Sequence, residues 1–503
     1  GEKLLDYYGI KGNKRLEYAY SCVNFEEHAK VMGKTGGFAQ IKTVVDFLRN
    51  SYGKEKTLLL DGGDTWQGTA TALWTRGKDM VGAMNLLGVD VAVGHWEFTY
   101  KAEEVLSNVK ELKAEFLAQN IFVKEDSMMN GVEAYDEDTG HAFKPYTIKK
   151  MGNARVAIIG QAFPYTTIAN PQRFIPDWTF GIKEDSMQEI VNKIKLDEKP
   201  DAIIVLSHNG FDTDKKMAEV VTGIDFIMGG HTHDGVPEAV PVKNANGTTY
   251  VCNAGSNGKF LNVLDLDIQK GKIKDFKFTL LPIFSDLIPE NKEMKKYIED
   301  VRLPFLKELT RPIATTEQTL FRRGNFNGSW DQIICDALLE VKEAQISLSP
   351  GFRWGTSVMP GQTITFDDLM TQTAMTYPET YARDIKGEDI KAILEDVADN
   401  LFNEDPFYQQ GGDMVRTGGI SYKINPTAKM GERITDIVLT KTGEKLDASK
   451  SYKVAGWSTV GAQSEGEPVW ETVETYLKNV KHITNVKVDT PDIIGVKGNP
   501  GII

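Results

Sequence analysis

Short apolar runs, rich in Val, Ile and Leu, recur through the first half of the chain and are the strongest constraint on its fold. Each run ends in Gly, Asp, His or Asn, and helix-like stretches at 37–49, 101–115 and 184–195 flank or separate them. Apolar strands that alternate with helices are typical of βαβ units with strands buried on both faces. The sequence therefore predicts a layered α/β domain, with strands at 57–60, 89–93, 116–118, 155–159, 202–206, 225–228 and 249–252.

The pattern changes after residue 260, which indicates a second domain. Residues 261–280 alternate apolar and polar side chains, as strands with one wet face do. Residues 289–310 carry many Lys and Glu residues in helical spacing before Pro312. A chain of 503 residues is also too long for one ordinary core. We therefore expect a first domain over 1–288 that closes with a hairpin, a linker helix over 289–312, and a smaller α/β domain over 313–503.

Composition and charge exclude several classes of function. Hydrophobic residues make up 41% and charged residues 26%, the balance of a globular protein that can bury large cores. The 58 basic and 71 acidic residues give a net charge of -13, which repels nucleic-acid phosphates and anionic lipid. No apolar run approaches the roughly 20 residues that cross a bilayer. We therefore expect no nucleic-acid partner and no membrane insertion.

Histidines gather where the predicted strands end. Four motifs follow apolar runs: DGGD at 61–64, GHWE at 94–97, SHNG at 207–210 and GGHTHD at 229–234. Of the 7 histidines in the chain, these motifs hold His95, His208, His231 and His233. The carboxyl ends of strands in an α/β sheet are where ligands bind. The sequence therefore predicts that these side chains converge on one site.

The residue types in these motifs indicate a metal centre. Imidazole nitrogens with an Asp oxygen suit Mn²⁺, Fe²⁺ or Zn²⁺, and a carboxylate can bridge two ions. Taken alone, Asp64 would be a helix N-cap, and His231 and His233 would be turn residues bonded to the backbone. The set as a whole favours a dinuclear site, with Asp61 as a structural carboxylate beside it.

The motifs GGDTWQG, GHWEF, SHNG and GGHTHD, in this order, resemble the calcineurin-type metallophosphoesterase domain of the 5′-nucleotidase family. Within that family, the segments GHWEFTY, SPGFRWGTS, EDVADNLFN and QQGGDMVRTGGISY are similar to those of the Sox-pathway thiosulfohydrolases, so the match covers nearly the whole chain. The resemblance implies a layered metallophosphoesterase sandwich, followed by a 5′-nucleotidase-type C-terminal domain that supplies substrate contacts. It also implies a periplasmic hydrolase with two Mn²⁺ ions.

The resemblance assigns roles to the motif residues. It implies that Asp64 bridges the two Mn²⁺ ions, that His95, His208 and His231 complete the shell of one ion, and that His233 serves the other. In relatives the motif at 94–97 usually reads Gly-Asn-His-Glu, so His95 replaces an Asn ligand and the next residue, a Trp, replaces a catalytic His. That lost His would stabilise charge on a phosphate or its leaving alkoxide. A sulfur leaving group needs less help, because a thiol has a pKa of about 8.5, far below that of an alcohol.

The implied substrate is a carrier-protein cysteine that bears a sulfane-sulfonate, Cys-S-S-SO₃⁻, and hydrolysis releases sulfate and leaves a persulfide. The implied partner is a sulfur carrier of the SoxYZ type with a C-terminal cysteine arm. Arginine suits sulfonate oxygens because its fork donates two hydrogen bonds at once. We expect Asp64, His95 and Arg416 to act in catalysis, and Arg353, Arg416 and Trp96 to contact the substrate. The alternative for each arginine is a surface or interdomain ion pair.

Two other functions stay open. A nucleotide or sugar-phosphate hydrolase would use the same metal motifs, but it does not explain Trp96. A nucleotidase should also place two aromatic rings of the second domain face to face around a base. A binding protein with a vestigial metal site is supported by residues 1–35, which lack the family's first motif, Asp-x-His. We expect the chain to begin downstream of that motif, which would leave the second metal position, at Asp64 and His233, incomplete.

Overall fold

The first domain contains a six-stranded sheet in the computed structural model, which describes residues 2–322, 324–461 and 463–495. The strand order is β10-β11-β9-β8-β6-β5. The four inner strands are parallel, and the two edge strands are antiparallel to their neighbours. The bounds are β5 (Tyr146–Met151), β6 (Ala154–Gln161), β8 (Ala202–Ser207), β9 (Phe226–Gly229), β10 (Val240–Asn244) and β11 (Gly247–Asn253).

A second, smaller sheet faces the first. Its strands are parallel and short, in the order β1-β2-β3: β1 (Leu60–Asp61), β2 (Val91–Ala92) and β3 (Glu115–Phe116). The predicted hairpin is present as β12 (Phe260–Gln269) paired with β13 (Lys272–Pro282). Each of the seven predicted strands overlaps an observed one, although β1 to β3 are only 2 residues long.

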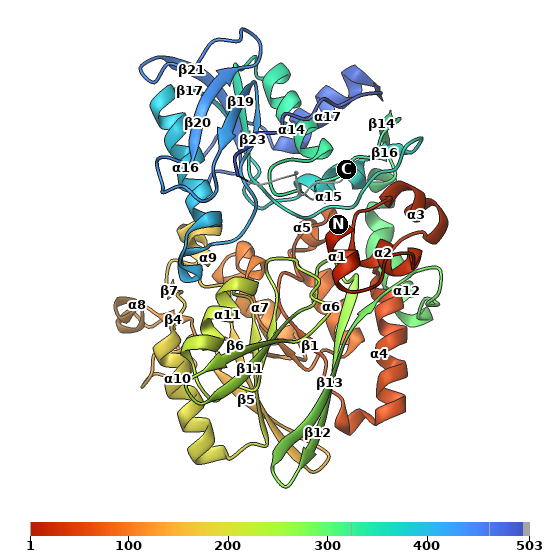
Figure 1. Cartoon of the computed structure of the whole chain (residues 1–503), viewed down its shortest axis with the longest axis vertical. Helices are drawn as coiled ribbons and strands as arrows, with labels where there is room; N and C mark the ends of the chain where they lie inside the picture. The colour runs from red at the N-terminus through yellow and green to blue at the C-terminus, as the bar shows by residue number, and fades with distance from the viewer. Residues whose placement is uncertain (1, 323, 462, 496–503) are drawn as a thin grey trace.

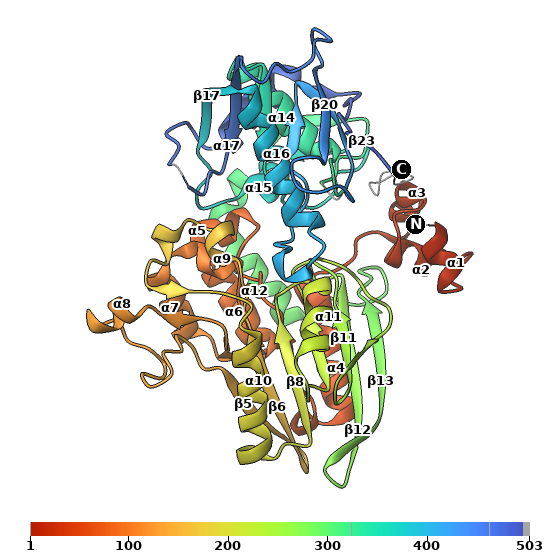
Figure 2. The ribbon, with the colours of Figure 1, turned by 60° about the vertical axis from the view of Figure 1, so that its left-hand side comes forward.

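Burial on both faces explains why the inner strands are apolar at every position. In β8, Ile203 and Val205 pack among the helices α10 (Glu184–Lys193) and α11 (Phe211–Val220). Ile204 and Leu206 point the other way, toward the small sheet. Since successive side chains of a strand alternate between faces, this pattern places two cores on either side of one sheet. The first domain is therefore layered as helix, sheet, sheet, helix (Figures 1 and 2).

Helices form the outer layer beyond the small sheet. The predicted helices at 37–49 and 101–115 correspond to α4 (Phe38–Tyr52) and α7 (Ala102–Glu111), and α6 (Lys78–Leu87) lies in the same layer. The predicted linker contains α12 (Lys292–Arg302), which packs on α4 and α6, and then α13 (Leu306–Leu309). The remaining elements of this half are α1 (Glu2–Tyr7), α2 (Lys14–Tyr20), α3 (Phe25–Met32), α5 (Ala70–Thr75), β4 (Phe122–Val123), α8 (Glu125–Met129), α9 (Thr166–Ala169) and β7 (Trp178–Thr179).

The second half of the chain forms a separate mixed α/β layer above the first domain (Figure 1). Its main sheet has the order β17-β21-β15-β18, with bounds β15 (Ile346–Ser349), β17 (Thr380–Lys386), β18 (Arg416–Gly418) and β21 (Ser451–Trp457). Two smaller sheets contain β14 (Pro312–Thr316), β16 (Thr363–Thr365) and β22 (His482–Ile483), and β19 (Ile420–Ile424), β20 (Ile434–Leu439) and β23 (Asp492–Ile493). The helices are α14 (Ser329–Val341), α15 (Phe366–Thr373), α16 (Gly387–Phe402) and α17 (Val469–Val480). Residues 496–503 of the predicted second domain lie outside the described residues.

The two halves share an apolar contact. Ala70, Trp96 and Phe174 of the first half belong to the same buried cluster as Trp330 and Tyr377 of the second. Polar contacts cross beside it, including a hydrogen bond from the Gln67 side chain to the Ala374 carbonyl (2.6 Å). Among the residues that the structure describes, no helix has both the length and the apolar character needed to cross a membrane.

Candidate metal centre

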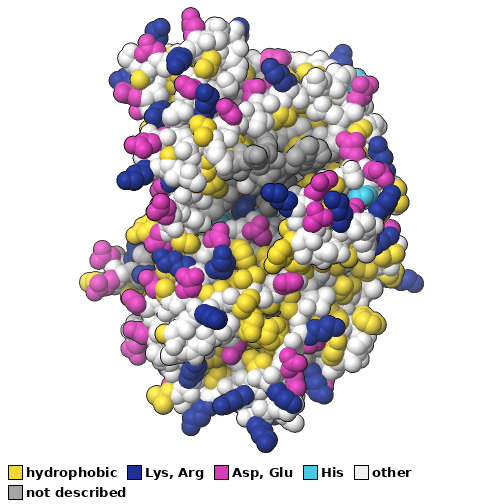
Figure 3. Space-filling model, in the orientation of Figure 1, with side chains coloured by type: hydrophobic (Ala, Val, Ile, Leu, Met, Phe, Trp, Pro, Cys, Tyr) yellow, Lys and Arg dark blue, Asp and Glu magenta, His cyan; other side chains and the backbone are white. Residues whose placement is uncertain are grey.

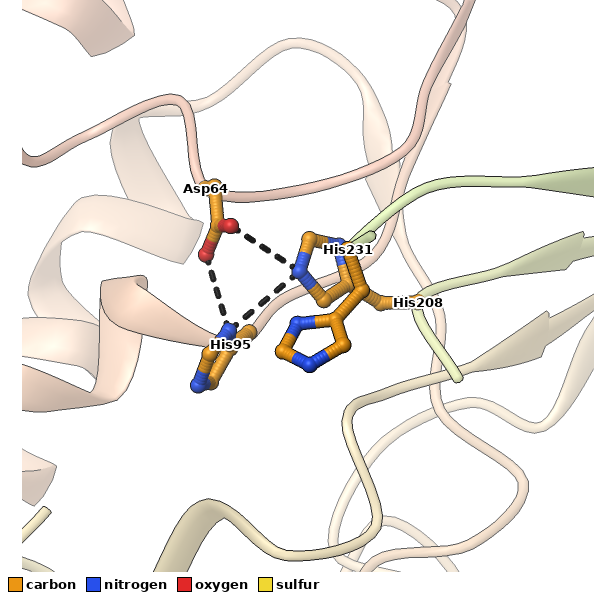
Figure 4. Close-up of side chains that lie close together, drawn as sticks. All are labelled: Asp64, His95, His208 and His231. Atoms are coloured by element: carbon orange, nitrogen blue, oxygen red, sulfur yellow. Dashed lines mark hydrogen bonds and ion pairs between the residues drawn. The ribbon is translucent and has the colours of Figure 1, made fainter. Parts of the chain in front are cut away.

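Four of the predicted ligands meet at one point. One ligand atom from each of Asp64, His95, His208 and His231 lies within 4.8 Å of the other three. The Asp64 carboxylate is 3.0 Å from His95 Nδ1 and 3.0 Å from His208 Nε2, and these two nitrogens are 3.2 Å apart. Figure 4 shows the carboxylate facing His95 and His208, with the His231 ring beside them. His95 and His208 are each only 2% exposed, so the cluster is sealed from bulk water on that side.

Strand ends from both sheets deliver these side chains. Asp64 follows β1, His95 follows β2, His208 follows β8 and His231 follows β9. The pairing of β1 with β2 ends at Asp61 and Ala92, and the pairing of β8 with β9 ends at Leu206 and Met228. The cluster residues follow these last pairs directly. Because the strands within each sheet are parallel, their carboxyl ends lie together, as is usual for ligand sites in α/β folds.

The turns after these strands need unusual backbone. Asp64, His231 and His233 have φ angles of 66°, 73° and 63°, in the left-handed region that residues with a Cβ seldom adopt. Such conformations persist only where the surrounding structure holds them, and they concentrate at functional sites. Placing these three side chains therefore costs conformational free energy, which contacts elsewhere in the fold offset.

Hydrogen bonds to backbone carbonyls fix which nitrogen two of the buried imidazoles present. His208 Nδ1 contacts the Gly62 carbonyl, so its Nε2 faces Asp64. His231 Nε2 lies 3.1 Å from the Gln410 carbonyl, to which it donates, and its Nδ1 is buried with no hydrogen-bond partner among the described residues. An imidazole that donates one N–H to a carbonyl presents the other nitrogen as a lone pair, the form that metals bind.

Charges at the cluster suit a cation. Burial lowers the pKa of His95, and burial together with His95 and His208 lowers that of His231 well below its usual value. Burial opposes ionisation of Asp64, but His208 and His95 outweigh it and hold the pKa of this carboxyl well below normal. Burial disfavours protonation of His208, but the contact with Asp64 outweighs burial and raises the pKa of His208. The set thus offers a carboxylate anion and three imidazoles, two of which have a buried nitrogen without a hydrogen-bond partner among the described residues. This donor set fits a borderline divalent metal ion.

Glu97 is a site residue that the sequence reasoning missed. Its buried carboxylate accepts backbone N–H groups from Asp64 (3.1 Å), Thr65 (2.7 Å) and His95 (2.7 Å). Burial and the charge of Asp64 raise the pKa of Glu97 to about 7. Glu97 therefore connects the loops that carry two of the cluster residues. Its place inside the GHWE motif, two residues after His95, was the available signal.

His233 and Asp61 lie next to the cluster and are not part of it. His233 is half-buried and lines the same cavity, but it is not among the four residues whose ligand atoms converge. The Asp61 carboxylate accepts the Gly63 N–H (2.9 Å) and the Thr65 hydroxyl (2.8 Å), which stabilises the turn before Asp64. Within residues 2–35, the only histidine is His28, which is buried 3.8 Å from Glu17 and away from the cluster.

The cluster opens into a cavity of 1490 Å³. One wall consists of second-domain loops at 351–356 and 410–413. Another part lies between β1 and β12 and is lined by apolar side chains such as Leu60, Leu264 and Leu266. Figure 3 shows hydrophobic side chains gathered on this face of the first domain, below the groove between the domains. The cavity therefore joins a polar metal-facing end to a long apolar recess.

Arg353 reaches the site, but its guanidinium N–H groups donate to backbone carbonyls. Its two terminal nitrogens donate to the carbonyls of Thr232 (2.9 Å) and His231 (2.8 Å). The side chain lines the cavity, beside the turn that carries two predicted ligands. The structure thus brings Arg353 to the metal centre, as expected, and gives it a contact with the histidine turn that the sequence did not predict.

Arg416 requires a correction, because it does not face the cavity. It is 1% exposed, and its guanidinium lies 3.3 Å from Asp331 and 3.0 Å from Asp413, and 2.6 Å from the Gly324 carbonyl. Glycine-rich loops suggested an arginine that reaches across the domains, but the carboxylate on α14 turns this side chain inward. The ion-pair alternative describes its surroundings, and its predicted catalytic and substrate-binding roles have no geometric support.

Three aromatic side chains close the cavity above the cluster. Phe352 and Trp354 stack on each other, with ring centroids 4.1 Å apart and planes inclined by 15°. Trp96 meets both edge-on, at 5.7 Å and 5.4 Å. Since Phe352 and Trp354 are already in contact, no third ring fits between them. Trp96 is 8% exposed and links the metal-site loop to the second domain.

Comparisons with known proteins agree with this architecture. Residues 312–472 match the family described as "5′-nucleotidase, C-terminal domain". The structure of the sulfate thiohydrolase SoxB from Thermus thermophilus is similar with a TM-score of 0.91 and 34% identity, over 99% of this chain and 90% of that one. A 5′-nucleotidase precursor, also from Thermus thermophilus, shares the fold, with a TM-score of 0.78 and 23% identity over 92% of this chain and 94% of that one.

Curated relatives include nucleotidases at lower identity. The 5′-nucleotidase of Bos taurus is 26% identical over 467 residues, which cover 83% of this chain and 76% of that protein. The trifunctional nucleotide phosphoesterase YfkN of Bacillus subtilis (strain 168) is 28% identical over 461 residues, or 82% of this chain. This chain spans only 30% of the length of YfkN.

Proposed function

Because this chain belongs to the SoxB branch of the 5′-nucleotidase family, we propose that it is a metal-dependent thiosulfohydrolase, which releases sulfate from a cysteine S-thiosulfonate on a sulfur carrier protein. The family and the converging carboxylate and imidazoles support a hydrolase with a dinuclear metal site. The thiosulfonate substrate is the specific part of the proposal.

The stacked pair of Phe352 and Trp354 is the observation that carries this choice. A nucleotidase needs a slot between two aromatic rings for the base, and here the two candidate rings fill that slot with each other. Trp96 packs against their edges, which holds the pair in place. A thin, flexible cysteine arm needs no such slot. The aromatic geometry therefore supports a carrier arm over a nucleotide.

In the proposal the cluster holds one Mn²⁺ ion, and a second ion lies at the position that lacks the family's first-motif ligands. Asp64 would contact both ions, His95, His208 and His231 would hold one, and His233, which lines the same cavity, would hold the other. When bound, such ions polarise water and neutralise charge that develops on the sulfonate oxygens. The chain's own residues supply the imidazoles and a carboxylate fixed by the backbone N–H of Trp96.

Trp96 is compatible with the proposed leaving group. No acid stands at this position, and the Trp96 backbone N–H donates to the Asp64 carboxylate at 3.1 Å. In the overall reaction water supplies an OH group to the sulfonate sulfur and releases its other proton to solvent. The S–S bond to the sulfonate breaks, and its electron pair leaves on the carrier's sulfane sulfur, which becomes the persulfide anion. Thiols have a pKa of about 8.5, so this sulfur departs as an anion without a dedicated proton donor.

The proposed partner is a SoxYZ-type carrier with a C-terminal cysteine arm, and the proposed compartment is the periplasm. The cavity supports an arm, because its polar end is at the cluster and it continues between the domains. The acidic surface argues against a nucleic-acid partner, since a net charge of -13 repels phosphate backbones.

A paired substrate assay tests the proposal. The chain is loaded with Mn²⁺ and given a peptide that ends in Cys-S-S-SO₃⁻, and in a parallel reaction AMP. We expect sulfate from the peptide and at least about 100-fold slower phosphate release from AMP, as kcat/KM. Asp64→Asn serves as the matched control and should release neither product, because it removes the shared carboxylate.

Two results would contradict the proposal. Comparable turnover of AMP would favour the 5′-nucleotidase alternative, which the curated nucleotidase relatives support. A chain that holds fewer than two ions and turns over neither substrate would favour a binding protein with a vestigial centre.

A further inference from the structure

The two domains touch each other at the turn that carries His231. Arg353 of the second domain donates to the His231 carbonyl (2.8 Å) and to the Thr232 carbonyl (2.9 Å). Both carbonyls belong to a turn in which His231 and His233 hold left-handed backbone. A turn of this kind keeps its shape only when neighbours fix it, and Arg353 binds it with two charge-assisted hydrogen bonds.

A second loop of the same domain fixes the imidazole of His231. The Gln410 carbonyl lies 3.1 Å from His231 Nε2 and accepts its proton. This hydrogen bond leaves Nδ1 as the lone-pair nitrogen, and Nδ1 is the atom buried without a hydrogen-bond partner among the described residues. Partners that orient a histidine in this way typically account for about 10–100-fold in metal affinity.

Gly411 lets this loop come so close. A Cβ added at Gly411 would lie 2.2 Å from His231 Nε2, which is closer than real atoms approach. Gly412, its neighbour, also has a positive φ, but a Cβ there would meet nothing within 4 Å. The loop is therefore shaped at position 411 to receive the ring of His231.

We propose that the second domain positions His231 for metal binding, through the side chain of Arg353 and the backbone of Gln410 and Gly411. Metal retention then depends on the contact between the domains, although all four cluster residues belong to the first domain. By linkage, the ion stabilises that contact as much as the contact stabilises the ion. Arg353 is a positioning residue in this account.

Arginine variants test the first contact. Mn²⁺ affinity is measured by equilibrium dialysis, and Mn²⁺ release is timed after addition of a chelator. We expect Arg353→Ala to bind Mn²⁺ about 10–100-fold more weakly and to release it faster. Arg353→Lys keeps the charge but loses the planar fork that spans both carbonyls, so it should lie between Arg353→Ala and wild type. Arg173→Ala is the control, because Arg173 also donates across the domains, to the Val460 carbonyl at 3.4 Å, far from the metal turn in sequence.

A glycine pair tests the second contact. Gly411→Ala and Gly412→Ala impose similar backbone strain, with φ angles of 71° and 83°, and differ in the clash with His231. We expect Gly411→Ala to lose Mn²⁺ affinity and Gly412→Ala to keep most of it. The melting temperature of each variant in chelator reports whether the metal-free fold is intact.

Several outcomes would overturn the inference. They are unchanged Mn²⁺ binding in Arg353→Ala, equal losses in Arg353→Ala and Arg173→Ala, equal binding by the two glycine variants, and a wild-type chain that retains no Mn²⁺. These measurements use no substrate. The inference requires a metal at the cluster but no particular substrate, so a failed sulfate assay would not contradict it. If the metal measurements contradict the inference, the sulfate assay still decides the substrate.

Discussion

Buried arginines hold the glycine-rich loops of the second domain together. Arg416 pairs with Asp413 and Asp331, and Arg322 pairs with Asp331 at 2.9 Å. Arg322 also donates to the carbonyls of Gln372 and Pro350. These contacts lie directly beside the loops at 351–356 and 410–413, which form one wall of the cavity. Arg416 thus acts on the site through the loops, from within the domain core.

Removing Arg416 should destabilise the fold. Arg416→Met leaves the Asp331 and Asp413 carboxylates buried with fewer partners, which typically costs about 3–5 kcal/mol. The free energy of unfolding from urea denaturation measures this. Lys296→Met is the control, because the exposed pair of Lys296 and Asp300 should contribute less than about 1 kcal/mol. A loss for Arg416→Met as small as that for Lys296→Met would contradict the network.

The residue types in the sequence predicted which side chains form the cluster. They did not predict the direction in which individual side chains point. Asp64 and the histidines stood out because they follow buried strands, where side chains converge. The sequence did not predict that Arg416 points into the domain core, because its ion-pair partner Asp331 lies 85 residues away in the chain. The contribution of Gln410 was invisible, since its backbone carbonyl makes the contact. Any residue type could have supplied that carbonyl.

Strand existence was predictable from apolar runs, while strand pairing was not. The inner strands of the large sheet agree with their predicted positions to within a few residues, because both faces are buried. The small sheet kept only 2-residue strands, since its loops leave the ladder to build the metal turns. The meeting of β1 and β2 with β8 and β9, across two sheets, follows from tertiary packing that no local pattern records.

Strand β3 is joined to β5 and its preceding loop by one carboxylate. Glu115 contacts Lys144 at 2.5 Å, Lys149 at 2.6 Å and Thr147 at 3.0 Å. Burial opposes ionisation, but the hydrogen bonds from Lys144 and Lys149 outweigh it and lower the pKa of Glu115 to about 2. A carboxyl whose folded pKa is lowered stabilises the fold above its unfolded pKa and loses that contribution as the pH falls.

Glu115→Gln should therefore show a pH-dependent loss of stability. At pH 7 the variant should be less stable than wild type, and the difference should shrink as the pH falls below 4.5, the ordinary value for a glutamate, toward 2. Urea midpoints across this pH window measure the difference. Glu111→Gln, at an exposed ion pair with Lys78, gives the size of a surface change. A difference between Glu115→Gln and wild type that stays constant with pH would contradict the assignment.

At the scale of the molecule, the metal centre and the domain contact form one unit. Trp96 belongs both to the metal-site loop and to the apolar cluster shared with the second domain. Arg353 and Gln410 approach the same site from the other side. Ligand binding to the folded state stabilises it by mass action, so an ion at this point should stabilise both domains.

Metal withdrawal should therefore lower the melting temperature of the whole chain. Free Mn²⁺ at about 100 times its Kd should contribute about 2.7 kcal/mol relative to the metal-free protein. Scanning calorimetry with Mn²⁺ and with chelator measures the shift, and Asp64→Asn should show little of it. Equal melting curves for the wild type in both conditions would contradict a metal at the cluster.

Three of the predicted ligands have backbone conformations that favour glycine. The left-handed φ angles of Asp64, His231 and His233 cost a residue with a Cβ about 1–2 kcal/mol each. Glycine at any of these positions would relieve this backbone cost in the metal-free protein and would delete a candidate ligand. A glycine variant would thus gain stability without metal and lose the stabilisation that a bound ion adds.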